Sequence, residues 1–248
     1  MHAAQILGGF PSFQRLEQGL LAQLASISRI VEVAREAILC RQGEPPKALH
    51  YLLNGQITLT QSAANGTSAV IDVVEPVRSV VLADAVAGHP NAMTARTLKP
   101  SRLLEIPAAP LRELIAVRPK LAVAMLEGLS WEVASTTRQV LDLKLRSSAQ
   151  RLGCYLLSLA QFPGANGGEF RLPFQKRLLA ERIGCRFEHL SRAFALLREY
   201  GVETRGSRVI LHDMVRLRDF AAPDDASLPI GSAPLSRAAK ALGDAFRF

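Results

Sequence analysis

The stretch from Phe174 to Tyr200 reads FQKRLLAERIGCRFEHLSRAFALLREY and predicts two helices joined by a tight turn. Leu179 and Ile183 recur at the spacing of one buried helix face, and Leu190 begins a second such face. Gly184 lies between the two faces, where a tight turn needs a residue that tolerates positive φ. The pattern therefore predicts a helix-turn-helix over this stretch.

The second predicted helix carries a polar face near its N-terminal end. This face falls away from the apolar stripe and consists of Arg186, Glu188, His189, Ser191 and Arg192. In a recognition helix, side chains at this end reach base edges in the major groove of DNA. A basic amphipathic helix pair is also found as a solvated helical hairpin that binds nothing, and the residues that follow help to separate the two interpretations.

Those residues predict a wing. Gly201 ends the second helix, and Val202 to Thr204 and Arg208 to Leu211 predict two short strands about the turn Arg205-Gly206-Ser207. A hairpin directly after a helix-turn-helix is typical of winged DNA-binding domains and weakens the solvated-hairpin alternative. Three further basic side chains in and around this unit are candidate DNA contacts, namely Lys176, Arg205 and Arg208.

The segment from about Ser147 to Phe220 resembles the winged helix-turn-helix of the CRP/FNR family of bacterial transcription factors. The resemblance rests on Ile183-Gly184-Cys185, followed by Glu188-His189-Leu190-Ser191-Arg192. The FNR-like branch carries Glu, two residues, then Ser-Arg, as this chain does. The cyclic-AMP-receptor branch instead has Arg before that Glu and Gly before the final Arg, where this chain has Phe187 and Ser191. The resemblance implies a TTGA half-site with an inverted TCAA partner in promoter DNA, and RNA polymerase as a further partner.

Composition and charge fit this interpretation. The 248 residues carry a formal charge of +8, and their 48% hydrophobic content is ample for packed cores. Residues 146–220 hold 13 Lys/Arg against 7 Asp/Glu, whereas residues 1–145 hold 14 against 12. The basic excess therefore concentrates in the predicted DNA-binding part, which favours a polyanionic partner.

Cysteine usage and hydropathy predict a cytoplasmic protein. Cys40, Cys154 and Cys185 are widely spaced, odd in number and contain no CxxC pair. No run reaches the about 18 apolar residues of a membrane span, and the first residues lack a signal segment, so we expect no membrane association.

Residues 1–117 predict a β-rich domain that opens with an amphipathic helix. Short Val- and Ile-rich segments broken by Gly, Pro and Asn are typical of a jelly roll, with Asn54-Gly55 and Asn65-Gly66 as hairpin turns. The predicted strands are 29–33, 37–40, 48–53, 56–61, 69–74, 93–98 and 102–106. The runs Arg41 to Pro45 and Leu49 to Ile57 resemble the opening of the family's cyclic-nucleotide-binding-type β-roll. The fold class is therefore α+β, with a β-roll, a long helix and a winged helix-turn-helix.

Cyclic-AMP dependence is not expected. Family members that bind a cyclic nucleotide hold it with a Gly-Glu pair and an Arg-Ser pair, and a buried phosphodiester needs such a cation. The matching region here reads Val80 to Ala85, and Asn91-Ala92-Met93 precedes Thr94-Ala95-Arg96. The Arg-Ser pair is missing. The remaining candidate effector-pocket residues are His89, Asn91 and Arg96, although strand alternation predicts that Arg96 faces solvent.

Other sensing chemistries leave two candidates. An iron-sulfur cluster needs about four thiolates, and the first 39 residues contain no Cys, so no such cluster is expected. A haem would need an axial ligand, for which His2, His50 and His89 are candidates, although a loop His is commonly only solvated. Cys185 is a redox candidate, because the positive helix end and nearby arginines would lower its thiol pKa, or else a small residue that fills the turn.

The segment Leu121 to Leu145 predicts one long helix. Its residues follow alternating steps of four and three that form a heptad seam, namely Ala122, Leu126, Leu129, Val133, Thr136, Val140 and Leu143. Such a seam can be buried within one domain. In the family, however, the equivalent helix pairs with its twin, so the resemblance implies a parallel homodimer and an inverted-repeat operator.

The sequence thus predicts an effector-sensing β-roll at 1–117, a dimerisation helix at 118–146, a winged helix-turn-helix at 147–220, and a tail at 221–248 that the resemblance does not cover. A transcription regulator is the favoured function. No Ser-His-Asp set, Gly-rich phosphate loop or HExxH motif supports an enzyme. The remaining alternative is a cyclic-nucleotide-binding-type sensor or scaffold module that does not bind DNA.

Overall fold

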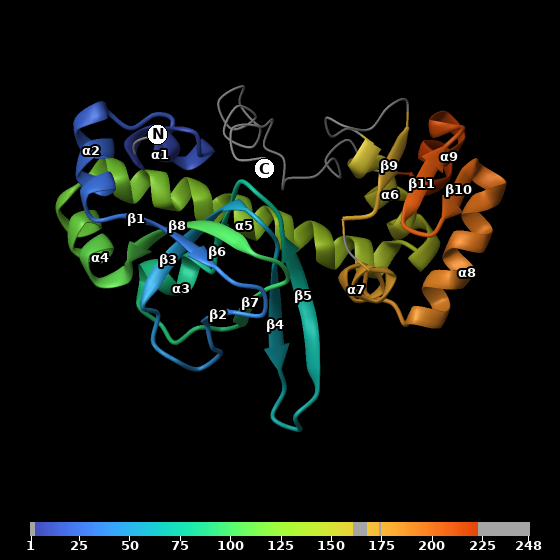
Figure 1. The fold of residues 1–248 in the computed structure, drawn as a ribbon, viewed down its shortest axis with the longest axis horizontal. Helices are drawn as coiled ribbons and strands as arrows, with labels where there is room; N and C mark the ends of the chain where they lie inside the picture. Colours follow the sequence, from blue (N-terminus) through green and yellow to red (C-terminus); the bar gives the residue numbers. More distant parts are fainter. Residues whose placement is uncertain (1–2, 161–167, 174, 223–248) are drawn as a thin grey trace. The chain divides into compact units, whose positions relative to one another are not determined.

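The computed structural model describes residues 3–160, 168–173 and 175–222 (Figure 1). The described chain divides into two compact units, residues 3–133 and residues 134–222. Within these residues, no helix combines the length and the apolar character needed to cross a membrane.

The first unit is built on two antiparallel four-stranded sheets. One has the strand order β1-β8-β3-β6 and the other β2-β7-β4-β5, which confirms the predicted jelly-roll architecture. The strands are β1 (Arg29–Val33), β2 (Ile38–Cys40), β3 (Ala48–Asn54), β4 (Ile57–Ser62), β5 (Ser68–Val74), β6 (Arg78–Val80), β7 (Thr94–Thr97) and β8 (Ser101–Pro107).

Alternation along the strands separates the two faces of the first sheet. On β3, Tyr51 packs on the helices, whereas Leu52 belongs to a cluster between the two sheets with Leu103 and Ile57. The predicted turn at Gly55 has φ of 117°, and a Cβ there would lie 2.0 Å from the Oγ of Ser101. Only glycine fits this turn, which leads from β3 in one sheet to β4 in the other, so the prediction of a hairpin at Asn54-Gly55 is wrong.

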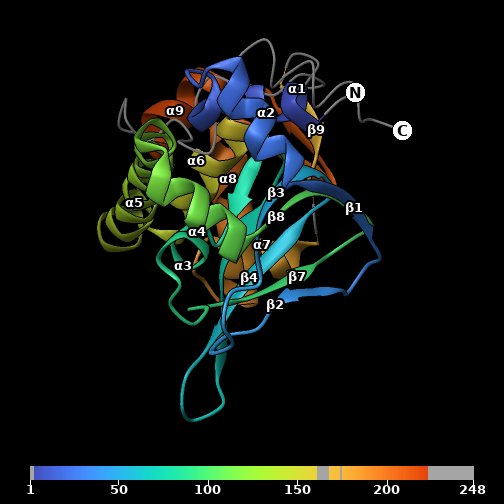
Figure 2. The same cartoon turned by 90° about the vertical axis from the view of Figure 1, so that its left-hand side faces the viewer.

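Helices cover the outer face of the first sheet (Figure 2). They are α1 (Ala3–Gly8), the 3-10 turn η1 (Pro11–Phe13), α2 (Gln18–Ser26), α4 (Ala108–Val117) and the first part of α5 (Pro119–Leu145). The rings of Phe10 and Phe13 lie 4.4 and 5.3 Å from that of Tyr51, so an aromatic cluster anchors the N-terminal segment to β3. Strand β6 and the short helix α3 (Leu82–Ala87) were not predicted.

The second unit is a winged helix-turn-helix, as predicted. Its elements are α6 (Ser148–Ala160), β9 (Glu169–Arg171), α7 (Lys176–Arg182), α8 (Phe187–Leu197), the 3-10 turn η2 (Arg198–Tyr200), β10 (Val202–Arg205), β11 (Arg208–Leu211) and α9 (Met214–Ala221). The wing has a third strand that was not predicted, because β9 pairs with β11 to give the order β10-β11-β9. Leu179, Leu190 and Phe194 join one core with residues of α6 and the wing.

Candidate nucleic-acid interface

The turn between α7 and α8 has the geometry that its sequence predicts. Gly184 has φ of 66°, and a Cβ at that position would lie 2.4 Å from a methyl group of Leu143. Any larger residue would be strained in its backbone and would clash. This glycine therefore brings the start of α8 close to the rest of the unit.

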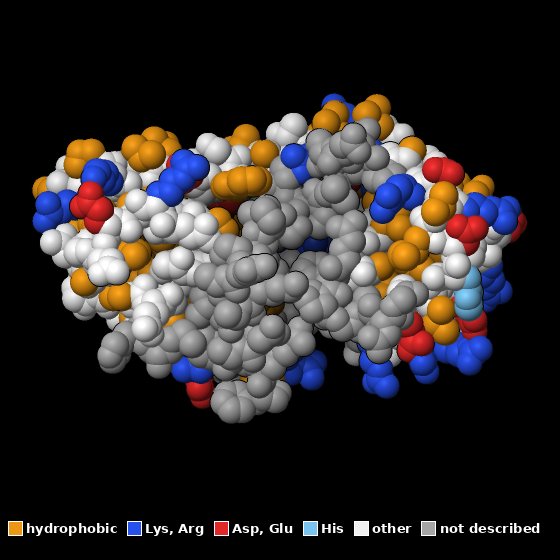
Figure 3. All heavy atoms as spheres, turned by 90° about the horizontal axis from the view of Figure 1, so that it is seen from above, with side chains coloured by type: hydrophobic (Ala, Val, Ile, Leu, Met, Phe, Trp, Pro, Cys, Tyr) orange, Lys and Arg blue, Asp and Glu red, His pale blue; other side chains and the backbone are white. Residues whose placement is uncertain are grey.

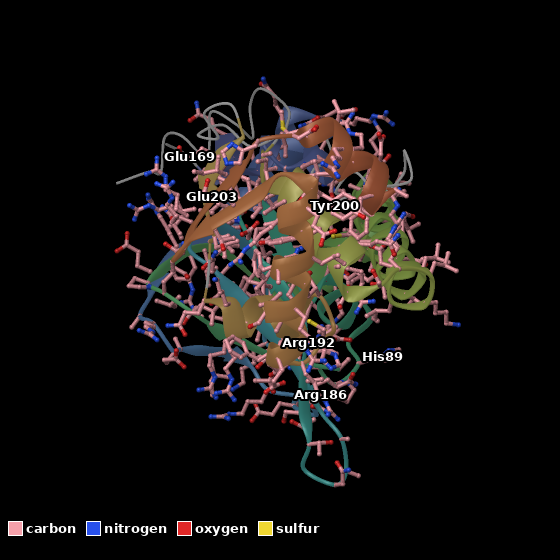
Figure 4. All side chains as sticks on the ribbon, turned by 90° about the vertical axis from the view of Figure 1, so that its right-hand side faces the viewer. His89, Glu169, Arg186, Arg192, Tyr200 and Glu203 are labelled. Carbon is pink, nitrogen blue, oxygen red and sulfur yellow. The ribbon has the colours of Figure 1, made fainter. Side chains whose placement is uncertain are left out.

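Helix α8 presents its predicted polar face to solvent. Leu190, Phe194 and Leu197 are buried on one side, while the five polar side chains of the other side, Arg186, Glu188, His189, Ser191 and Arg192, are all exposed. Figure 4 shows Arg186 and Arg192 toward the N-terminal end of α8, at the opposite end from Tyr200. The buried stripe thus fixes the orientation of a polar reading face.

Two charged side chains of this face are free of ion pairs within the described residues. Glu188 and Arg192 lie one helical turn apart on the same side of α8. Within the residues that the structure describes, neither has an ion-pair partner. Phe187, at the first position of the helix, is 49% exposed beside them. A carboxylate and a guanidinium left unpaired on an exposed helix face can each form hydrogen bonds to base edges.

Lys176 lies apart from this face and has an internal contact. Its Nζ is 5.1 Å from the centre of the Phe194 ring, and the residue is half-buried. This cation–π contact holds the start of α7 against α8. The side chain is therefore placed to support the helix pair.

The wing carries a row of three arginines across its sheet. Arg205 pairs with Arg208 in the strand register, and Arg208 pairs with Arg171. Directly opposed residues of antiparallel strands share a face, so the three guanidinium groups project from the same side. Arg205 and Arg208 were predicted as DNA contacts, whereas Arg171 was not, since a strand of three residues gives almost no alternation signal.

Acidic side chains on the same wing engage two of these arginines. Arg205 Nε donates to Glu203 Oε1 at 2.6 Å, and Arg208 forms an ion pair with Glu169. Hydrogen bonds from His212 and then Arg205 hold the pKa of the Glu203 carboxyl below its ordinary value. Figure 4 shows Glu169 and Glu203 on the strands of the wing, and Figure 3 shows acidic and basic side chains side by side over this unit.

Arg171 differs from its two neighbours. It is exposed, and in the described part of the chain no ion pair involves it. Its guanidinium is therefore the one of the three that is available to a phosphate without competition from a carboxylate.

The predicted lowering of the Cys185 thiol pKa is wrong. Burial raises the pKa of Cys185, and the guanidinium of Arg151 only partly opposes this. The neighbours Arg182 and Arg186 do not supply the expected effect, because Arg182 lies over the ring of Tyr155 and Arg186 is exposed. Cys185 is half-buried and contributes to the core of the unit, which favours the interpretation as a turn-filling residue.

We expect Cys185 to react slowly with alkylating agents at neutral pH. A raised pKa leaves little thiolate, so the rate should still be increasing above the ordinary thiol pKa of about 8.5. Mass spectrometry of iodoacetamide-treated protein against pH measures this, with Cys185→Ser identifying the modified peptide. A rate that reaches its plateau below neutral pH would instead support a reactive thiol.

The predicted effector-pocket residues lie in different surroundings. His89 is exposed, and Arg96 is exposed and forms an ion pair with Glu36 at 3.6 Å. Only Asn91 is buried, and its Nδ2 donates to the backbone oxygens of Arg41 and Glu44. Asn91 therefore fastens the loop after β2, and the expectation that Arg96 faces solvent is confirmed.

The histidines considered as haem ligands do not share one site. His50 is buried, with its Nε2 3.3 Å from Glu105 Oε2, and His2 lies outside the described residues. The hydrogen bond with His50, and then that with Arg29, lowers the pKa of Glu105 to about 2. Among the described residues, no group of three or more His, Cys, Asp or Glu side chains is placed to hold a metal ion.

Between the two sheets of the first unit, an arginine is engaged by a buried carboxylate. Arg78 pairs with Leu52 across β6 and β3, so it shares the face that Leu52 directs between the sheets. Its Nη1 donates to Asp72 Oδ2 at 2.9 Å, and Asp72 is 6% exposed. This guanidinium thus already has an anionic partner within the chain.

The long helix α5 exposes part of its predicted seam. Leu126, Val133 and Val140 are 61%, 66% and 44% exposed. Leu129, by contrast, is partly buried against the core of the first unit. Three of the four residues named for the dimer helix therefore form an apolar row that no part of the described chain covers.

Comparison with known proteins matches each of the two units to a known domain type. Residues 30–118 match the cyclic nucleotide-binding domain model, and residues 150–220 match the Crp-like helix-turn-helix domain model. The chain is 23% identical over 217 residues to the anaerobic regulatory protein of Pasteurella multocida, covering 84% of this chain and 79% of that protein. It is 24% identical over 217 residues to the CRP-like cAMP-activated global transcriptional regulator of Mycobacterium tuberculosis H37Rv, covering 86% and 97%. FixK2 from Bradyrhizobium japonicum has the same fold, with a TM-score of 0.69 at 15% identity over 78% of this chain and 97% of that one.

Proposed function

Because this chain belongs to the CRP/FNR family of transcription regulators, we propose that it binds an inverted repeat in promoter DNA as a homodimer and acts on RNA polymerase there. The observation that carries the proposal is the exposure of Glu188 and Arg192 on the reading face of α8, where neither has an ion-pair partner among the described residues. The relatives named above are regulators, and we propose no catalytic role for this chain.

The proposed half-site is TTGA, with TCAA as its inverted partner. Glu188 accepts a hydrogen bond from the amino group of a cytosine or adenine, and Arg192 donates to guanine, the pairings that suit these side chains in the major groove. Ser191 adds a shorter contact. Arg186 and the wing arginines bind phosphates, which position the protein without reading sequence.

The proposed dimer uses the apolar row of α5. Leu126, Val133 and Val140 are spaced seven residues apart, as one position of a heptad requires, and a second copy would bury them. A parallel pair would place two α8 helices about 34–36 Å apart, one turn of DNA. We propose residues 1–117 as the sensing domain and 118–146 as the dimerisation helix. Residues 147–220 then form the DNA-binding domain.

We propose that the effector is not cyclic AMP. The Arg-Ser pair is absent from the segment Asn91 to Arg96, where the family carries it, and Arg78, which lies between the sheets, is already bound to Asp72. A phosphate would have to displace this buried carboxylate from the guanidinium, at the cost of their ion pair. A haem, a thiol oxidant, or the absence of any effector are the alternatives for the regulatory signal, and the absorption spectrum of the purified protein distinguishes the first from the others.

Cyclic AMP is accordingly expected to leave the melting temperature unchanged. A ligand at 100 times its dissociation constant stabilises a protein by about 2.7 kcal/mol, which a thermal-shift titration detects easily. A TTGA–TCAA duplex serves as the positive control, because a bound duplex should raise the melting temperature. A clear shift with cyclic AMP would contradict the proposal.

Binding titrations test the function directly. Fluorescence anisotropy with a TTGA–TCAA palindrome and a scrambled duplex, at two salt concentrations, should give much tighter binding to the palindrome and a salt-dependent weak affinity for both. If no duplex is bound, the chain is a sensor or scaffold module and the proposed function is wrong.

A further inference from the structure

Arg151, on α6, joins two segments of the second unit that are far apart in the sequence. Its Nε donates to the backbone oxygen of Ile183 at 2.7 Å, and its Nη2 donates to that of Gly184 at 3.1 Å. Its Nη1 donates to the backbone oxygen of Arg146 at 2.6 Å. One guanidinium therefore binds the turn before α8 and the junction that follows α5.

These carbonyls need an external donor. Ile183 and Gly184 follow the last residue of α7, and Arg146 follows the last residue of α5, so their oxygens lie beyond the regular helical hydrogen bonds. A guanidinium suits the position because its five N–H groups point outward from a rigid plane. A lysine ammonium at the end of a flexible chain cannot span the same three oxygens in this way.

A second contact joins the same two segments. A methyl group of Leu143, in the last turn of α5, lies against Gly184 so closely that a Cβ there would be 2.4 Å away. Arg146 is itself fixed, since its side chain pairs with Asp142 and donates from Nη2 to the backbone oxygen of Ala222 at 2.9 Å. The end of α5 and the turn before α8 are thus held together by packing and by hydrogen bonds.

We propose that Arg151 is a positioning residue that fixes the start of the recognition helix α8 relative to the end of α5 and so determines which spacing between half-sites the dimer accepts. The inference rests on the proposed function, because α5 must pair with a second copy and α8 must read DNA. Arg151 itself is assigned no contact with a base.

The experiment uses the full-length chain carrying Arg151→Lys. The matched control is Arg177→Lys, which changes an exposed arginine on α7 whose ion pair, at 3.8 Å, is with Glu181 of the same helix. Affinities are measured on the best-bound TTGA–TCAA palindrome, on palindromes with one base pair added to or removed from the spacer, and on duplexes with one intact half-site against a scrambled one.

The wild type and the control should prefer the best spacer by about tenfold or more, since a shifted half-site loses its base contacts. In Arg151→Lys this preference should fall to about threefold or less, while discrimination between an intact and a scrambled half-site stays as in the wild type. Leu143→Ala, which removes the second contact, should weaken the spacer preference in the same direction.

Three outcomes are distinguishable. An unchanged spacer preference in both Arg151→Lys and Leu143→Ala overturns the inference. Loss of half-site discrimination in Arg151→Lys also overturns it, since the residue would then support the reading face itself. A wild-type chain that does not distinguish the palindrome from scrambled DNA contradicts the proposed function instead.

Discussion

Replacing Leu126 or Val133 by glutamate should convert the dimer to monomers and abolish tight binding to the palindrome. In a parallel pair the two copies of each residue face each other, so every substitution places two like charges in one apolar seam. Desolvation and repulsion should weaken the dimer by at least roughly 3 kcal/mol, a factor of more than about a hundred in its dissociation constant. Sedimentation equilibrium and the DNA titration measure the two effects.

Both residues are well exposed in the single chain, so neither substitution should disturb folding. Leu129 is unsuitable for this test, because it packs partly on the core of the first unit and a charge there would also destabilise the monomer. Val117→Glu is the matched control, at the end of α4 with 68% of the side chain exposed. If both seam variants sediment as unchanged dimers, the pairing surface lies elsewhere.

The parts of the fold that were predicted correctly are those set by local sequence. Gly184 and Gly201 occupy positive-φ positions at the ends of helices, as their places in the pattern required. The hairpin at Gly66, between β4 and β5, likewise follows from turn chemistry, whereas the turn at Gly55 joins strands of two different sheets and is not the predicted hairpin. For the longer strands with clear alternation, the predicted and observed bounds agree to within about two residues, the usual uncertainty of such boundaries.

The missed elements depend on pairings that local sequence does not contain. Strands β6 and β9 have three residues each, and both exist because they extend a sheet formed by distant segments. The same holds for the site. Arg171 joins the wing row only through the β9–β11 register, and Arg151 binds oxygens more than 30 residues later in the chain.

The thiol prediction failed for a related reason. Neighbours in sequence suggested a positive environment for Cys185, but Arg182 lies over the ring of Tyr155, Arg186 is exposed, and Cys185 is half-buried. Desolvation then outweighs the remaining charge, which changes the direction of the pKa shift. Proximity in sequence does not reveal burial.

The largest effect on specificity is expected for Arg192→Ala and Glu188→Ala. Each good base contact is worth about 1–3 kcal/mol of discrimination, and a symmetric dimer makes each contact twice. The difference in binding free energy between the palindrome and the scrambled duplex should therefore fall by about 2–6 kcal/mol in each variant. Binding to the scrambled duplex should keep its salt dependence, because the phosphate contacts remain. Arg198→Ala is the matched control, an exposed arginine just beyond the C-terminal end of α8.

Phosphate contacts should behave in the opposite way. Arg186→Gln and Arg171→Gln should weaken binding to both duplexes alike and reduce the slope of log affinity against log salt by about 1 each. Arg205 and Arg208 should contribute less, since carboxylates of the wing already engage them. The contrast is decisive for the reading face: unchanged affinity ratios in Arg192→Ala and Glu188→Ala would mean that α8 does not read bases, and its exposed charges would then be no more than the solvated side of a helical hairpin.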